Sequence, residues 1–150
     1  MKTRNALLVA CLCWASVAQQ QTTPPSETSH IANNVVFMSP GDKFGVNLAG
    51  TEDGTALSVT DEPNLKNANL VLSFRQEKGI MLFTIENRTE HWLTYEAGIR
   101  IPKRDGFYKT SVMPLGPRLS NVESWPHPID QLAFKNFSFT GKPGGKPAKK

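Results

Sequence analysis

The feature that most constrains the fold of this chain is an alternation of apolar side chains in short runs. The longest run occupies every second position of the segment 91–101: His91, Leu93, Tyr95, Ala97, Ile99 and Ile101. Successive side chains of a β-strand point to opposite faces, so this run predicts a strand with one apolar face. No segment after residue 18 keeps the apolar period of a helix over a usual helix length. We therefore expect an all-β fold.

Shorter runs of the same kind are separated by residues that favour turns. We expect strands over 35–38, 44–49, 57–59, 70–75, 80–85, 107–113 and 132–139, and mostly loop over 114–128. Pro40-Gly41, Asp53-Gly54 and Lys78-Gly79 mark turns. The apolar set changes parity between Phe134 and Phe137, which predicts a β-bulge near residues 135–136. Many short strands with frequent turns predict a single antiparallel β-sandwich, immunoglobulin-like as our first choice, with a small β-barrel as the alternative.

The segment 85–99, IENRTEHWLTYEAGI, is similar to the strand–Asn-x-Thr–strand corner of immunoglobulin-like domains. Such domains include the first domain of periplasmic pilus chaperones. The similarity covers 15 residues and implies a corner of this kind at Asn87. A pilus chaperone has a second domain for which this chain offers no room, so we do not infer membership of that family.

The first 18 residues have the pattern of a cleaved secretory signal peptide. Lys2 and Arg4 precede an apolar stretch, and Ser16-Val17-Ala18 supplies the small residues that a signal peptidase accepts. The apolar stretch is too short to span a bilayer. We therefore expect a periplasmic or secreted protein.

Both cysteines of the chain, Cys11 and Cys13, lie in this leader. Cleavage after Ala18 leaves a mature chain without cysteine, which excludes disulfides, a catalytic thiol and a cysteine-based metal site from it. The alternative is lipoprotein processing at Leu8-Val9-Ala10-Cys11, which would leave Cys11 lipidated. We favour it less because the apolar core before the cut would cover only residues 6–10.

The rest of the chain divides into three segments. Residues 19–32 are polar, contain two consecutive prolines and are expected to form a flexible lead-in. Residues 33–140 have a normal size for one domain. Residues 141–150, GKPGGKPAKK, are expected to form a disordered tail of Lys, Gly and Pro.

The net charge of +4 does not belong to the expected domain. Six of the 17 basic residues lie in the leader or the tail: Lys2, Arg4, Lys142, Lys146, Lys149 and Lys150. The other eleven stand against 13 acidic residues. A surface that follows the phosphates of a nucleic acid is therefore not expected. The tail predicts at most a weak contact with an anionic membrane surface.

The sequence gives little sign of catalysis. A hydroxyl nucleophile needs a histidine that an acid orients, and outside the lead-in only His91 and His127 could serve. His91 shares the apolar face of its strand, so we expect it to be partly buried. There is no Gly-x-Ser-x-Gly, no His-Glu-x-x-His and no dense acidic loop. We therefore expect no enzyme activity, no cofactor and no metal.

The aromatic residues indicate binding instead. The candidate binding residues are Trp92, Tyr108, Trp125 and His127. Trp92 lies on the polar face of its strand, where an exposed indole marks a contact surface unless a loop or second sheet covers it. Trp125 and His127 lie in Ser-Trp-Pro-His-Pro, where the prolines favour an ordered recognition loop. In the alternative reading, Trp125 closes one end of the sandwich.

Together these features predict an exported, non-catalytic β-sandwich that binds another envelope or secreted protein. Its role would be that of an inhibitor, an immunity factor or an assembly accessory. One alternative is a carbohydrate- or lipid-binding module in which Trp92, Tyr108 and Trp125 form a flat platform. A further alternative is a small hydrolase that uses His91 or His127 with a nearby carboxylate.

Overall fold

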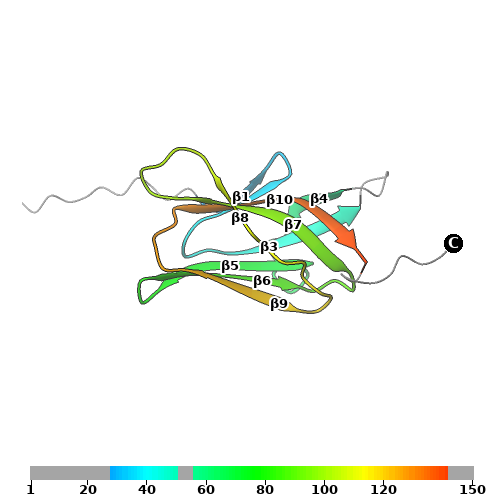
Figure 1. Cartoon of the computed structure of the whole chain (residues 1–150). Coiled ribbons are helices and arrows are strands. Elements are labelled where there is room, and N and C mark those ends of the chain that lie inside the picture. Colours follow the sequence, from blue (N-terminus) through cyan, green and yellow to red (C-terminus); the bar gives the residue numbers. More distant parts are fainter. Residues whose placement is uncertain (1–27, 51–55, 142–150) are drawn as a thin grey trace, which may run out of the picture.

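The computed structural model describes residues 28–50 and 56–141, which form two five-stranded antiparallel sheets packed face to face (Figure 1). The strands are β1 (His30–Ala32), β2 (Val35–Met38), β3 (Lys43–Gly50), β4 (Leu57–Asp61), β5 (Leu70–Glu77), β6 (Ile80–Asn87), β7 (Trp92–Arg100), β8 (Tyr108–Thr110), β9 (Ser120–Trp125) and β10 (Gln131–Thr140). Sheet A has the order β1-β2-β10-β7-β8, and sheet B has the order β4-β3-β5-β6-β9.

This arrangement confirms the prediction of an all-β sandwich. The two sheets stay separate, so the small-barrel alternative is wrong. No helix in the described part of the chain is long and apolar enough to cross a membrane. The predicted signal peptide, most of the lead-in, the Asp53-Gly54 turn and the tail beyond Gly141 lie outside the described residues.

The core lies between the sheets and consists of the alternate side chains that face inward. In β7 the inward set is Leu93, Tyr95, Ala97 and Ile99, all buried as the alternation predicts. Sheet B contributes Leu70, Leu72 and Phe74 from β5 and Met81, Phe83 and Ile85 from β6. Phe83 of sheet B stacks on Phe134 of sheet A with ring centroids 4.6 Å apart. Burial of these faces is the main force that holds the two sheets together.

Two of the predicted turns have backbone angles that their residues favour. Lys78 (φ 49°) and Gly79 (φ 83°) join β5 to β6 in a two-residue turn with both φ values positive, as the right-handed twist of a hairpin requires. Gly41 (φ 98°) follows Pro40, and the Asp42 N–H donates to the Ser39 carbonyl across this turn (3.2 Å).

The predicted β-bulge is present in β10. The register between β10 and β7 shifts between Lys135 and Ser138, and Asn136 adopts a positive φ of 55°. This extra residue lets Phe134 and Phe137 both point into the core, where both are buried.

Two strands were not predicted. Strand β1 lies in the expected lead-in, and it forms because Asn33 (φ 51°) and Asn34 (φ 61°) make a two-residue turn to β2. Strand β9 lies in the segment expected to be loop. Its inward positions are Asn121, Glu123 and Trp125, so it lacks a clear apolar alternation and owes its geometry to its pairing with β6.

Candidate functional site

The outer face of sheet A carries a groove with a volume of about 320 Å³. Its floor is formed by Gly98 of β7 and Ala133 of β10, which lie opposite each other in register. Phe37 of β2 and Phe107, which precedes β8, reach toward each other across this floor, with ring centroids 5.8 Å apart. A small residue is favoured at position 98, because a Cβ there would lie 3.2 Å from the Cβ of Phe107.

The N-terminal hairpin extends one wall of the groove. The His30 ring of β1 stacks on the Phe37 ring with centroids 5.0 Å apart. Phe107, on the other wall, is 41% exposed, and the Arg100 guanidinium lies 5.8 Å from the centroid of its ring. The groove is therefore an aromatic site that is assembled from the N-terminal hairpin and the segment between β7 and β8.

The rim of the groove is charged. Lys135 of β10 and Glu96 of β7 approach within 3.9 Å, and both side chains are about half exposed, so this pair adds little stability. Lys109 of β8 forms no ion pair with another described residue. The charged residues at the groove are Lys109, Lys135 and Glu96 in its lining, together with Arg100 beside the Phe107 ring. The surroundings of the groove therefore carry a net positive charge.

None of the residues predicted from the sequence lines this groove. Trp92 is half-buried at the start of β7, and a Cβ at position 116 would lie 3.3 Å from the end of its indole, so the β8–β9 loop covers one side of the ring. Tyr108 is 42% exposed. It pairs with Ile99, whose side chain faces the core, and it therefore points away from the outer face of sheet A.

Trp125 and His127 lie at the end of sheet B. Trp125 ends β9 opposite Met81 and packs partly against the core. His127 is exposed in the segment that follows.

The three aromatic residues of the predicted platform do not come together. Trp125 pairs with Met81 near the start of β6, whereas Trp92 follows the corner at the end of that strand. Trp92 and Trp125 therefore lie at opposite ends of the sandwich. Tyr108 lies at the same end as Trp125 but on an edge strand of the other sheet.

The histidines considered for catalysis are both exposed. The expected partial burial of His91 is wrong, because this residue lies just before β7, where its ring is exposed and contacts Phe139 near the end of β10. Its ring centroid is 4.7 Å from that of Phe139. Among the described residues, no hydrogen bond or ion pair joins the imidazole of His91 or His127 to a carboxylate. Within the same part of the chain, no three His, Cys, Asp or Glu side chains gather as metal ligands.

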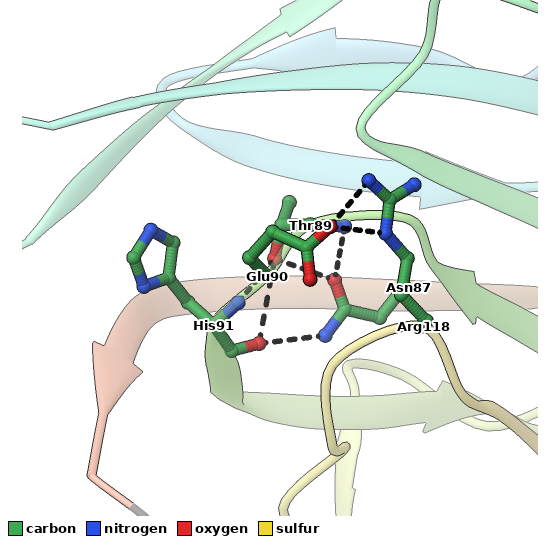
Figure 2. Close-up of polar contacts among 5 residues, drawn as sticks. All are labelled: Asn87, Thr89, Glu90, His91 and Arg118. Atoms are coloured by element: carbon green, nitrogen blue, oxygen red, sulfur yellow. Dashed lines mark hydrogen bonds and ion pairs between the residues drawn. The ribbon is translucent and has the colours of Figure 1, made fainter.

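A buried polar network fixes the corner between β6 and β7 (Figure 2). The Asn87 side chain is fully buried, and its Nδ2 donates to the carbonyl oxygens of His91 (2.9 Å) and Gly116 (2.9 Å). Its Oδ1 accepts from the Thr89 N–H (3.0 Å) and from the Thr89 hydroxyl (2.8 Å). These bonds satisfy a buried amide and attach the β8–β9 loop to the corner, so the network is structural.

An exposed ion pair lies on the solvent side of the same corner. Arg118 donates to Glu90 through Nε (2.8 Å) and Nη2 (2.6 Å), as Figure 2 shows. Both side chains are more than half exposed, so the pair contributes little to stability.

A second buried polar group, Tyr95, lies between the sheets. Its side chain is 6% exposed, and its hydroxyl has no hydrogen-bond partner within bonding geometry among the described residues. Burial, and to a smaller extent the carboxylate of Glu123, raise the pKa of Tyr95 to about 12, against a smaller opposite effect of the nearby Asn121 amide. Tyr95 therefore stays protonated at neutral pH.

The groove residues were not predicted from the sequence for two reasons. First, Phe37 and Phe107 belong to runs that predict ordinary strands. Second, only the strand order brings these two residues together. The sequence did contain one sign of the groove: Gly98 and Ala133 are small residues at outward-facing positions of two alternating strands. Comparison of the chain with protein-family models, with curated proteins and with solved structures finds no match, so the role of the groove is argued from its own residues.

Proposed function

We propose that this chain is an exported, non-catalytic protein that binds another envelope or secreted protein, and that the groove of sheet A is its contact surface. The observation that carries the proposal is the groove itself. An apolar floor beside a pair of contacting aromatic rings, with charged residues around it, has the arrangement of a protein interface, where an apolar centre is enclosed by a polar rim. Roles as an inhibitor, immunity factor or assembly accessory are all compatible with such a surface.

The size and charge of the groove support a particular kind of contact. A volume of about 320 Å³ is at the lower end for a small-molecule site and accommodates one large apolar side chain. The net positive charge around it favours a partner with acidic groups beside that side chain, because opposite charges speed association and select the partner. We therefore expect the partner to present an aromatic or branched aliphatic residue next to Asp or Glu.

The test fills the floor of the groove without changing the charge of the rim. Ala133→Leu adds a branched side chain to the floor of the groove, beside the Phe37 and Phe107 rings. The matched control, Thr60→Leu, adds the same side chain to an exposed position on the outer face of sheet B. Tagged protein is used to capture partners from an envelope extract with cross-linking, and bound proteins are quantified by mass spectrometry.

We expect wild type and Thr60→Leu to recover the same partner, and Ala133→Leu to recover it roughly tenfold less. Recovery of no partner after cross-linking argues against protein binding. Equal recovery by Ala133→Leu removes the groove from the proposal. In that case alanine variants of the four sequence-predicted residues identify which of them makes the contact: Trp92→Ala, Tyr108→Ala, Trp125→Ala and His127→Ala.

The alternative function is a carbohydrate- or lipid-binding module. The adjoining His30, Phe37 and Phe107 rings favour it, because aromatic faces bind sugar rings and acyl chains. Titration with envelope glycans or with phospholipid vesicles, followed by the amide NMR shifts of Gly98 and Ala133, separates the two functions. Saturable shifts with either ligand would replace protein binding by this alternative.

An immunoglobulin-like topology is the finer description that we propose for the sandwich. Two observations support it: the antiparallel pairing of β10 with both β2 and β7, and the Asn-x-Thr corner at Asn87. Export is proposed on the leader sequence alone.

A further inference from the structure

Three of the four edge strands of the sandwich are short or covered. Strands β1 and β8 have three residues each. The edge of β4 is capped by Asn34, whose Nδ2 donates to the Leu57 carbonyl (2.9 Å) and whose Oδ1 accepts from the Val59 N–H (2.8 Å). Asn34 thus takes the place of a neighbouring strand. Strand β9 is different, because it has six residues and no described residue bonds to the backbone of its outer edge.

The register shows which backbone groups of β9 face outward. The Asn87 N–H donates to the Leu119 carbonyl between β6 and β9 (2.9 Å). Backbone groups of an antiparallel strand alternate between its two sides, so Asn121, Glu123 and Trp125 bond to β6. The N–H and C=O groups of Ser120, Val122 and Ser124 therefore point away from the sheet.

The side chains of this edge are unusually open to pairing. Val122 is 60% exposed, and Leu119, which precedes the strand, is 54% exposed. The segment 119–125 contains no Lys, Arg or Pro, the residues that most often protect an edge strand from a neighbour.

We propose that β9 is a self-association surface, on which two copies of this chain pair their β9 strands antiparallel about a two-fold axis at Val122. In this register Ser120 lies opposite Ser124 of the second copy, and Leu119 lies opposite Trp125. Asn121, whose Nδ2 donates to Glu123 of its own strand (3.0 Å), lies opposite Glu123 of the second copy, so no like charges stand directly opposite each other. A second copy is the occupant because this sequence is complementary to itself under the symmetry that most homodimers use.

The pairing joins the two B sheets into one and covers Val122 and Leu119, which are exposed in a single copy. It adds backbone hydrogen bonds from the three outward-facing residues of each strand. A single short strand pair is a small interface, so we expect a weak dimer with a dissociation constant on the order of 100 µM. The inference does not rest on the proposed function, because no residue of the groove belongs to β9.

Sedimentation equilibrium of protein purified from cells that express the full sequence tests the proposal. Wild type is expected to be monomeric at about 10 µM and largely dimeric near 500 µM. Val122→Pro removes the central outward N–H, and an edge strand tolerates proline at such a position. Val122→Lys keeps the N–H but sets two ammonium groups against each other at the two-fold axis. The control, Val122→Thr, keeps both the N–H and the β-branched side chain.

We expect Val122→Pro and Val122→Lys each to raise the dissociation constant at least tenfold, and Val122→Thr to leave it within about threefold. Urea unfolding followed by tryptophan fluorescence verifies that each variant is folded. A wild-type chain that stays monomeric near 500 µM overturns the proposal. So does a dimer that persists unchanged in both folded variants.

Discussion

At the scale of single residues, two buried polar groups have opposite energetic roles. Asn87 makes hydrogen bonds with both of its side-chain polar atoms, whereas the Tyr95 hydroxyl makes none with the described residues. A buried polar group without a hydrogen-bond partner lowers the free energy of unfolding, so the Tyr95 hydroxyl destabilises the fold. Burial, and after it the carboxylate of Glu123, make the ionisation of the Tyr95 phenol unfavourable and raise its pKa.

The raised pKa of Tyr95 predicts a loss of stability at high pH. The folded state keeps the proton up to a pKa of about 12, whereas the unfolded chain releases it near 10. The free energy of unfolding should therefore hold below pH 10 and fall by about 2–3 kcal/mol between pH 10 and pH 12. Urea unfolding across this range measures the fall. Tyr95→Phe is the control.

Because it lacks the ionising hydroxyl, Tyr95→Phe should lose less stability over the same pH range. At pH 7 it should be as stable as wild type or more stable by up to about 1 kcal/mol, since it buries no unpaired hydroxyl. An identical fall in both proteins would mean that other groups cause it.

At the scale of elements, the β6–β7 corner and the β8–β9 loop form one unit because Asn87 bonds to both. The loop in turn covers Trp92, which therefore depends on the corner for its position. The exposed Glu90–Arg118 pair adds little to this unit.

Asn87→Asp tests this unit. The carboxylate keeps the acceptor toward Thr89 but loses the donor and sets a buried charge against the His91 and Gly116 carbonyl oxygens. We expect the free energy of unfolding to fall by about 3 kcal/mol, measured by urea unfolding. Asn67→Asp, at an exposed turn position, is the matched control and should change stability by less than about 0.5 kcal/mol. A small effect at Asn87 would show that the loop is held by other contacts.

The elements that the sequence predicts correctly are those whose own residues show a clear apolar alternation. Strand β7 alternates along its whole length, and the bulge in β10 is visible as a parity change between Phe134 and Phe137. Strand β9 was missed because an edge strand with Asn121 and Glu123 facing inward has no apolar period. Strand β1 was missed because the turn formed by Asn33 and Asn34 was not recognised as a hairpin signal.

The groove could not be predicted because it depends on strand order. Phe37 and Phe107 are far apart in the sequence, and β10 and β7 lie between them in the sheet. No local pattern specifies which strands become neighbours, since that choice follows from burying all the apolar faces together. The predicted residues Trp92 and Trp125 have distinctive local contexts, yet their positions at opposite ends of the sandwich are equally a result of topology.

At the scale of the whole molecule, positive charge is not restricted to the two ends of the chain. The sequence assigns six basic residues to the leader and tail and leaves a slightly acidic body. Within that body, three of the eleven remaining basic residues, Arg100, Lys109 and Lys135, lie at the groove beside the acidic Glu96. The local charge of the groove therefore differs in sign from that of the body as a whole, which is the basis on which we propose an acidic partner.

The processing of the N-terminus is a prediction about the whole chain. Mass spectrometry of the protein isolated from its host should find a mature chain that begins at Gln19, since small residues occupy the positions before that bond. A chain that begins at a lipidated Cys11 would establish the lipoprotein alternative. An intact Met1 would contradict export through this leader. As a control, Ala18→Arg should block cleavage at the predicted bond.

The place of β10 in sheet A has a consequence for the order in which the protein becomes folded. This strand is the last one described in the chain, yet it lies in the centre of its sheet, between β2 and β7 (Figure 1). Sheet A therefore cannot be completed until nearly the whole chain has been synthesised, and its pairing requires contacts between distant residues, which form slowly. All five strands of sheet B precede β10 in the chain, so sheet B has its complete set of strands earlier than sheet A. If the chain is exported as we propose, this late completion of sheet A would help it to cross the membrane before it is fully folded.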